Sequence, residues 1–407
     1  MNFVFVSLQR INTDRESTAT SLARELARQN HNVLYINSPV NRKDYFFPPG
    51  DAFVGAHVAA IKAGQEPLQQ LAPHLWVLHP PSLIDSFNWV PYTPLFSLLL
   101  RLNNARLAKD IKPALQKLGF DEFVLINDKD IFRSFYLQEY LRPSQTVYLD
   151  RDYTVGQPYW RRHGQTLEPV LMRKSGAVFC NSLDFTERAR RYNPNSFYIG
   201  NGFDAAQFSA EPAHALPPDL AAIPGPRIGY VGALITMRLD LPLLEELARQ
   251  RPKWSFVLVG WQDEAFERSA LHSLPNVYFL GRKHTHDVPA YLQHFDVCIN
   301  PQAINEITLG NFPLKILEYL AMGKPVVATV TNTMTEVFSE HSYLATGTAQ
   351  YLEQIEKALA EDSPRKAQER IAFVEKFSWK NIAAHCLSLC QQVAGASAVR
   401  PGKSRTM

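Results

Sequence analysis

The sequence is poor in cysteine, lacks a long apolar run and carries little net charge. Its four cysteines form no CxxC pair, which argues against a disulfide framework or a zinc site and favours a reducing compartment. No run approaches the roughly 20 apolar residues of a membrane span, and residues 1–7 lack the length and cleavage site of a signal peptide. A net charge of +3 gives no indication of nucleic acid binding. We therefore expect a cytoplasmic protein that binds no nucleic acid.

Three motifs are also missing, and each absence narrows the class of enzyme. No G-x-G-x-x-G follows a predicted strand, which argues against a nicotinamide-dependent dehydrogenase. No convincing set of histidine and carboxylate residues supports a nucleotide-sugar epimerase. No DxD-type motif stands at a predicted strand end in the second half of the chain, so we expect no metal ion and no other cofactor.

What the chain does contain is two series of short apolar runs separated by amphipathic stretches. The first series is 3–7, 33–37, 75–79, 123–127, 146–150 and 177–181. The second series is 227–232, 255–260, 277–281, 297–301 and 325–329. Near-continuous apolar strands with helices between them are typical of parallel sheets covered on both faces. The pattern predicts an α/β protein with two Rossmann-like domains, whose ligands bind where the strands end.

A proline-rich stretch with little periodicity separates the two series, and it reads as an interdomain linker. We expect an N-terminal domain over residues 1–195 and a C-terminal domain over 196–376. A final helix over 377–394 should pack back towards the N-terminal domain. Residues 395–407 are small, polar and basic, which predicts a disordered tail.

Residues 300–329 are the most informative segment. They read as strand, loop, helix, turn and strand, with the helix beginning near Pro313 and ending at Gly323. The loop before the helix carries Thr308, Gly310 and Asn311, and the free N–H groups at a helix start can bind a phosphate.

Lys315 and Glu318 are three residues apart and therefore share a face of this helix. A lysine can neutralise a diphosphate, and a carboxylate one turn along can accept hydrogen bonds from two ribose hydroxyls. The pattern therefore favours a nucleotide-sugar site. The alternative is a plain ion pair on the helix surface.

The run from Glu318 through Tyr-Leu-Ala-Met-Gly-Lys-Pro-Val-Val-Ala resembles the signature of the retaining GT-B glycosyltransferase family 4, in which this glutamate binds the donor ribose. The opening of the second series, residues 228–238, is similar to that family's first strand and phosphate loop, with Arg238 where a lysine usually faces the diphosphate. Asn201-Gly-Phe-Asp and Val277-Tyr-Phe-Leu-Gly also resemble family elements. The resemblance implies donor contacts from Gly232, Gly281, Arg282, Thr308, Gly310, Asn311, Phe312 and Glu318.

Three departures from the family pattern stand out. The family has a second glutamate eight residues before Glu318, where this chain has Gly310, and its usual arginine after Val231-Gly232 is Ala233. Lys315 is also atypical, since small or apolar residues usually stand at that position of the family.

The sequence is more similar to a bacterial branch that carries Pro-x-Lys-x-x-Glu-Tyr-Leu-Ala, as residues 313–321 do. This branch contains envelope and exopolysaccharide transferases of the teichuronic-acid type. That likeness implies a GT-B fold with a central cleft. It also implies transfer of a sugar from a nucleotide-sugar to a glycan or lipid-linked acceptor, with retention of the anomeric configuration. The expected donor nucleotide is UDP, because UDP is the most frequent one in such families. Arg238 and Lys315 would then neutralise the diphosphate. The missing glutamate keeps a catalytically silent, sugar- or partner-binding protein as an alternative.

The acceptor side is less clear. Gln9 and Arg10 follow the first strand and are candidate contacts to an acceptor or phosphate, or an ordinary solvated loop. Asp150 and Asp152 end another strand, and the bacterial branch favours Asp152 as the group that receives or orients the acceptor proton. Either aspartate could instead cap a helix. Glu168, in the helix that follows, is a candidate support for the acceptor pocket.

Residues 89–117 combine aromatic and leucine residues with five lysines and arginines. Such a segment can lie in a membrane interface. We favour the alternative, a buried pair of helices, but peripheral contact with the inner face of the membrane stays open.

Overall fold

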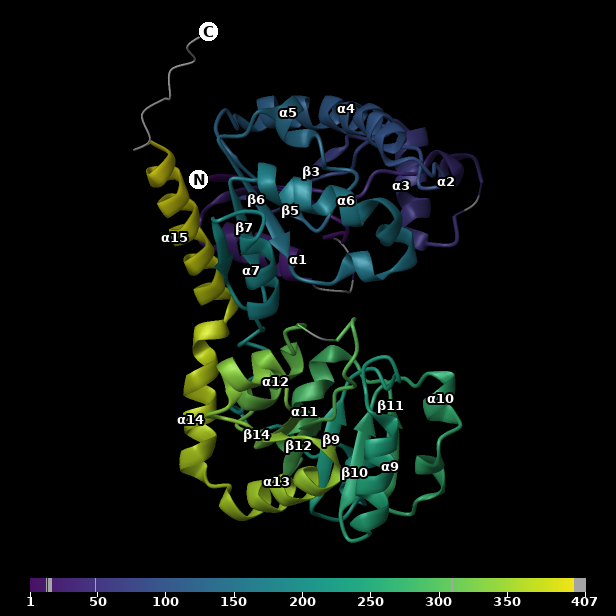
Figure 1. The fold of residues 1–407 in the computed structure, drawn as a ribbon, viewed down its shortest axis with the longest axis vertical. Helices are drawn as coiled ribbons and strands as arrows, with labels where there is room; N and C mark the ends of the chain where they lie inside the picture. The colour runs from purple at the N-terminus through teal and green to yellow at the C-terminus, as the bar shows by residue number, and fades with distance from the viewer. Residues whose placement is uncertain (12, 14–16, 48, 309, 399–407) are drawn as a thin grey trace. The chain divides into compact units, whose positions relative to one another are not determined.

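The computed structural model describes residues 1–11, 13, 17–47, 49–308 and 310–398. The chain forms two compact units, each built on one sheet (Figure 1). Unit 1 contains Met1–Asn181, Phe185–Gly200 and Ile382–Met407, and unit 2 contains Ser182–Asp184 and Asn201–Asn381. The main crossing, between Gly200 and Asn201, lies within a few residues of the boundary expected from the prolines.

Unit 1 has an eight-stranded sheet in the order β3-β4-β2-β1-β5-β6-β7-β8. Its strands are β1 (Asn2–Ser7), β2 (Asn32–Ile36), β3 (Leu68–Ala72), β4 (Leu75–Leu78), β5 (Val124–Asp128), β6 (Gln145–Asp150), β7 (Ala177–Cys180) and β8 (Ser196–Tyr198). All neighbours are parallel except β3 and β4. The six strands expected from apolar runs are confirmed, while β3 and β8 were not expected.

The helices of unit 1 connect these strands. They are α1 (Thr18–Arg28), α2 (Arg42–Phe46), α3 (Ala52–Lys62), α4 (Thr93–Leu118), α5 (Leu137–Leu141), α6 (Pro158–Lys174) and most of α7 (Leu183–Arg190). The Ser17 side chain caps α1 by accepting from the Thr20 backbone N–H, so this helix begins at Thr18.

Residues 93–118 form one helix, α4, so the expected pair of helices is wrong. Its apolar residues divide between two faces: Phe96, Leu100 and Leu107 are buried, whereas Leu98 and Leu102 are exposed. Within the described part of the chain, no helix has both the length and the apolar character needed to cross a bilayer.

Unit 2 has a six-stranded, fully parallel sheet in the order β11-β10-β9-β12-β13-β14. Its strands are β9 (Arg227–Val231), β10 (Ser255–Val259), β11 (Val277–Gly281), β12 (Val297–Asn300), β13 (Val326–Thr329) and β14 (Tyr343–Ala345). Its helices are α8 (Pro218–Ala221), α9 (Leu241–Gln250), α10 (Glu264–Glu267), α11 (Val288–Gln293), α12 (Leu314–Ala321), α13 (Gly347–Glu361) and α14 (Pro364–Val374). The five expected strands are confirmed; β14 was not expected.

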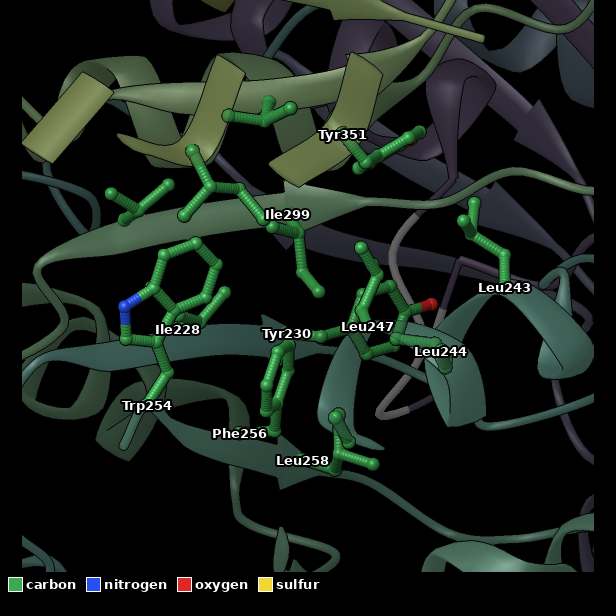
Figure 2. Packing of buried hydrophobic residues seen from close by; sticks show 14 of the residues in the cluster. Ile228, Tyr230, Leu243, Leu244, Leu247, Trp254, Phe256, Leu258, Ile299 and Tyr351 are labelled. Atoms are coloured by element: carbon green, nitrogen blue, oxygen red, sulfur yellow. The ribbon is translucent and has the colours of Figure 1, made fainter. Parts of the chain in front are cut away.

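The core of unit 2 lies between the sheet and helices α9 and α13. Figure 2 shows Ile228 and Tyr230 of β9 with Leu244 and Leu247 of α9 in this cluster. Alternate residues of β9 face opposite sides of the sheet, and Gly229, between the two, leaves no room for a side chain, since a Cβ there would lie 1.9 Å from the ring of Phe295.

Helix α15 (Trp379–Ala398) ends the described chain, and its residues from Ile382 onward belong to unit 1. The expected disordered tail from residue 395 is wrong for residues 395–398, which are helical. The rest of that tail, 399–407, lies outside the described residues.

Candidate functional site

Two loops at the carboxyl end of the unit 2 sheet are held together by backbone hydrogen bonds. The Asp240 N–H donates to Pro301 O, and the Ala303 N–H donates to Arg238 O, both at 2.9 Å. The Asn305 side-chain amide donates to Met237 O at 2.9 Å. The loop after β9 is thus fixed against the loop after β12, and Arg238, whose side chain is exposed and has no described partner, lies where they meet.

Helix α12 follows the second loop and is anchored to β9. Pro313 is its N-cap, and Gly323, at φ +71°, ends it in the left-handed conformation, as the sequence predicts. The Val231 N–H donates to the Tyr319 hydroxyl at 2.9 Å, and that hydroxyl donates to Val231 O at 3.2 Å. The buried face of α12 thereby fixes the orientation of its other, partly exposed face, which carries Lys315 and Glu318.

The Lys315 ammonium points to the end of β9. Its Nζ donates to the Tyr230 hydroxyl at 2.5 Å and lies 4.2 Å from the centre of that ring. Gly232, at φ +144°, lies directly beside this ammonium, since a Cβ there would lie 2.9 Å from Nζ and 3.0 Å from the Tyr230 hydroxyl oxygen. A fixed positive charge therefore stands directly beside the first strand-end loop.

Glu318 does not pair with Lys315. The structure shows no ion pair between these two described residues and no described donor to the Glu318 carboxylate, so the simple ion-pair alternative is wrong. Burial raises the pKa of Glu318 to about 7, and the positive charge of Lys315 opposes that rise. A carboxylate without a donor in a poorly solvated place is suited to accept hydroxyl groups from a ligand.

The loop before α12 uses several of its predicted ligand-binding groups internally. Thr308 is buried, and its hydroxyl donates to Ala303 O and accepts from the Asn305 N–H. The Asn311 amide nitrogen donates to Ile307 O at 2.7 Å, while its buried Oδ1 has no partner. Gly310 adopts φ +81°. Thr308 therefore shapes the loop, and Asn311 retains a free acceptor.

The remaining predicted donor contacts differ in exposure. Phe312 is buried and packs against Phe338 and Phe377, with ring centroids 5.5 and 5.9 Å away. Gly281, at φ +67°, and Arg282 are exposed at the end of β11, an edge strand of the sheet. Phe312 thus stabilises the base of the loop, and the other two lie at the same sheet end as Gly232.

In unit 1, Asp150 and Glu168 meet in a buried charge cluster. The Lys129 ammonium, itself buried, pairs with both carboxylates, at 2.6 Å from Glu168, and Arg188 lies 2.7 Å from Asp150. The Tyr148 hydroxyl donates to Glu168 at 2.7 Å. Two cations balance two carboxylates, so this cluster holds β6, α6 and α7 together. Lys129 and Arg188 were missed, because only the fold brings them to these carboxylates.

Asp152 lies outside that cluster and is half exposed. Its carboxylate accepts from Arg151 at 2.7 Å, and Arg151 also binds the buried Asp128 at 2.6 Å. Of the two aspartates considered, Asp152 is therefore the one that solvent and a ligand can reach.

Gln9 and Arg10 follow β1. The Gln9 side chain is exposed, while its backbone carbonyl accepts from the Tyr35 hydroxyl at 3.0 Å. Arg10 is partly buried and lies 3.4 Å from Nδ1 of His57. The Arg10 side chain is therefore partly enclosed, and its neighbour His57 was not predicted.

Part of the chain matches a known protein family. Residues 225–361 match the family model described as glycosyl transferases group 1. They form a group 1 glycosyltransferase domain. The matched range contains β9, the two strand-end loops and α12, so the site described above lies within the family's own region.

A sequence relative extends the likeness. Over 138 residues the chain is 35% identical to a Bacillus subtilis protein provisionally named teichuronic acid biosynthesis glycosyltransferase TuaH. The match covers 32% of this chain and spans about a third of that relative, 33% of its length.

Solved structures resemble the group 1 glycosyltransferase domain together with unit 1. Sucrose-phosphate synthase from Thermosynechococcus elongatus gives a TM-score of 0.64 at 17% identity, covering 97% of this chain and 99% of that one. Anabaena HepE in complex with UDP gives 0.64 at 16% identity, covering 96% and 100%. At these identities the likeness shows the fold, which is GT-B. Among the described residues, no group of three or more His, Cys, Asp or Glu side chains is placed to hold a metal ion.

Proposed function

We propose that this protein is a retaining, metal-independent glycosyltransferase. It transfers a sugar from a nucleoside diphosphate sugar, UDP in the first instance, to a glycan or lipid-linked acceptor during synthesis of a cell-surface polysaccharide at the cytoplasmic face of the membrane. The named function of the B. subtilis relative and the UDP bound by Anabaena HepE support the substrate class.

The observation that carries this proposal is the pair of side chains on α12. The ammonium of Lys315 is held at Tyr230 beside the backbone of Gly232, and the Glu318 carboxylate has no described donor. An ammonium next to glycine backbone suits a diphosphate, and a carboxylate lacking donors suits the two hydroxyls of a ribose.

The reaction breaks the bond between the sugar anomeric carbon and the oxygen of the β-phosphate. The bonding electrons stay on the nucleoside diphosphate, so negative charge grows on its phosphate oxygens. Lys315, Arg238 and the N–H groups at the start of α12 are the groups that stabilise that charge. The acceptor hydroxyl forms the new bond to the same carbon and gives up its proton, and Asp152, the more accessible of the two candidate aspartates, can receive or orient it.

The direct test is release of the corresponding nucleoside diphosphate from a panel of UDP-, GDP- and dTDP-sugars with purified full-length protein. Lys315→Met should lower turnover by roughly 100-fold or more, with unchanged thermal stability. Lys253→Met, which removes an exposed lysine of unit 2, is the matched control and should leave turnover unchanged. Wild-type turnover in Lys315→Met would contradict the assignment.

The same panel separates the proposed enzyme from the silent alternative suggested by Gly310. A silent protein would bind UDP without releasing it from any sugar. Unchanged turnover after EDTA treatment is the expected result for a metal-independent enzyme, and the anomeric configuration of the product, read by NMR, tests retention.

We also propose that unit 1 contacts an anionic bilayer through α4 and the segment before it. The exposed apolar side chains here are Trp89 at 73%, Tyr92 at 65%, Leu95 at 47%, Leu98 at 60% and Leu102 at 53%. Exposed basic residues of the same helix, Arg101, Lys109 and Lys112, complement a negative lipid surface.

Vesicle flotation tests this surface. Leu98→Asp with Leu102→Asp should abolish binding to phosphatidylglycerol vesicles, because both side chains are exposed; Leu99 is avoided because it packs against the core. Leu216→Asp, at an exposed leucine of unit 2, is the control. Equal flotation of the double variant and the wild type would remove the membrane contact.

A further inference from the structure

Unit 1 contains a cavity of about 440 Å³ at the carboxyl end of its sheet. Arg10 follows β1, Asn37 follows β2, and His79 follows β4, which are neighbouring parallel strands. Helix α3 closes one side with Phe53 and His57. Strand ends of parallel sheets are where this architecture binds ligands.

The polar lining consists of Arg10, Asn37, His57 and His79 at one group of positions and of Gln65, Glu66 and Gln69 at another. The Glu66 carboxylate pairs with Lys117, whereas the Arg10 guanidinium contacts His57. Nε2 of His57 lies 3.1 Å from Pro80 O, so this nitrogen carries the proton and donates it. Nδ1 then accepts from Arg10, at 3.4 Å. Burial, Arg10 and His79 lower the pKa of His57 to about 4, so the ring is neutral at pH 7 and positions the guanidinium without adding charge.

Arg10 has no carboxylate partner within ion-pair distance among the described residues. Most of its N–H groups are therefore free to bind a ligand. Asn37 is 2% exposed, and its Oδ1 accepts from the Ile11 N–H at 3.0 Å, whereas its amide nitrogen donates to no described group. An unused amide donor on Asn37, beside an arginine without a carboxylate partner, points to an acceptor supplied from outside.

Part of the cavity lining is apolar. Phe53, Ala56, Ala60 and Ile61 of α3 line it. Apolar side chains together with a few polar groups are the usual lining of a small-molecule site, and this combination suits a sugar ring that carries a charged substituent.

We propose that this cavity binds the oxyanion of the acceptor, so that the acceptor is a sugar bearing a phosphate or a carboxylate. Arg10 and Asn37 donate to the oxyanion, His57 positions Arg10, and α3 contacts the sugar ring. Only the identification of this ligand as the acceptor rests on the proposed function. The cavity binds an anionic sugar whether or not transfer occurs.

Calorimetry with the full-length protein tests it, with UDP at saturation so that anions cannot occupy the donor site. The probes are glucose 1-phosphate, glucuronate and glucose. We expect one or both anionic sugars to bind at least tenfold more tightly than glucose. Comparison of glucose 1-phosphate with glucuronate shows whether the cavity prefers a phosphate or a carboxylate. Arg10→Gln should weaken that binding at least tenfold, while Arg28→Gln, which removes an exposed arginine of the same unit, should not.

Two further variants keep the result interpretable. Phe53→Glu places a carboxylate at a 45% exposed position of the cavity wall, and it should weaken anion binding even if Arg10→Gln folds poorly. Lys315→Ala should bind the anionic sugars as the wild type does. Absence of UDP binding by the wild type, with intact anion binding, would defeat the proposed function alone. Equal binding of glucose and the anionic sugars, or unchanged anion binding in both Arg10→Gln and Phe53→Glu, would overturn the cavity proposal.

Discussion

Glu318 makes the stability of the protein depend on pH in a way that reports on its role. Its pKa in the folded protein is about 7, above the ordinary value of 4.5. The folded state therefore holds this proton more tightly than the unfolded chain does. The resulting contribution to the free energy of unfolding is complete below pH 4.5 and is lost as pH rises through 7. Urea unfolding without ligand should show Glu318→Gln more stable than wild type at pH 8, by up to about 3 kcal/mol, with little difference at pH 4.5.

The same residue gives the opposite trend for ligand binding. An ionised carboxylate accepts from both ribose hydroxyls, so UDP affinity of the wild type should rise between pH 6 and 8 more steeply than that of Glu318→Gln. The variant also corrects for ionisation of UDP itself. Parallel pH profiles for the two proteins would mean that Glu318 does not contact the nucleotide.

Lys129 offers a second test at the residue scale. It is buried between Asp150 and Glu168, and Lys129→Met leaves two buried carboxylates with Arg188 alone. Removing one partner of a buried charge cluster costs roughly 3–5 kcal/mol. Denaturant unfolding should show that loss, with UDP affinity of the folded protein unchanged. A stable Lys129→Met protein that fails only in transfer would instead assign the cluster to the acceptor reaction.

Among the secondary-structure elements, β9 belongs both to the hydrophobic core of unit 2 and to the candidate donor site. Gly229→Ala would place a methyl group 1.9 Å from the ring of Phe295, in the middle of a central strand. Overpacking of this kind costs roughly 1–3 kcal/mol, and the displaced strand also carries Tyr230 and Gly232. We expect a lower melting temperature together with weaker UDP binding. Gly281→Ala is the control, because a Cβ there meets no atom within 4 Å. This variant introduces backbone strain at a strand end without overpacking, so it separates the two effects.

How far the sequence predicts these elements depends on what surrounds them. Central parallel strands are buried on both faces, so their apolar runs stand out, and all of those expected are present. The strand β3 has the sequence Leu-Gln-Gln-Leu-Ala and therefore shows no continuous apolar run. It is an antiparallel edge strand whose residues are partly exposed. The strands β8 and β14 have three residues each, too short for any periodicity.

The candidate site was predictable where local signals define it. A proline and a glycine bracket α12, and the spacing of Lys315 and Glu318 places both on one face. The contact between Lys315 and Tyr230 was not predictable, since it joins residues 85 positions apart through the register of a strand and a helix. Likewise, the cavity around Arg10 depends on α3 and β4, which carry no motif.

At the scale of the whole molecule, α15 links the end of the chain to its beginning. The helix starts in unit 2, yet its residues from Ile382 onward belong to unit 1. The buried side chains of that part are Ile382, Ala383, Cys386, Leu389, Cys390 and Val393. Each large one contributes about 1.5–3 kcal/mol when fully buried, a sum comparable to the whole stability of a domain.

Truncation after Asn381 should therefore destabilise unit 1 and spare unit 2. Hydrogen exchange followed by mass spectrometry should show faster exchange in β6, β7 and β8, while the β9–β14 sheet keeps its protection and UDP still binds. Removing only residues 399–407 is the control, because it leaves α15 complete. Since unit 2 supplies the proposed donor site, the truncated protein should bind nucleotide but transfer no sugar. Equal loss of protection in both sheets would show instead that α15 stabilises the two units as one.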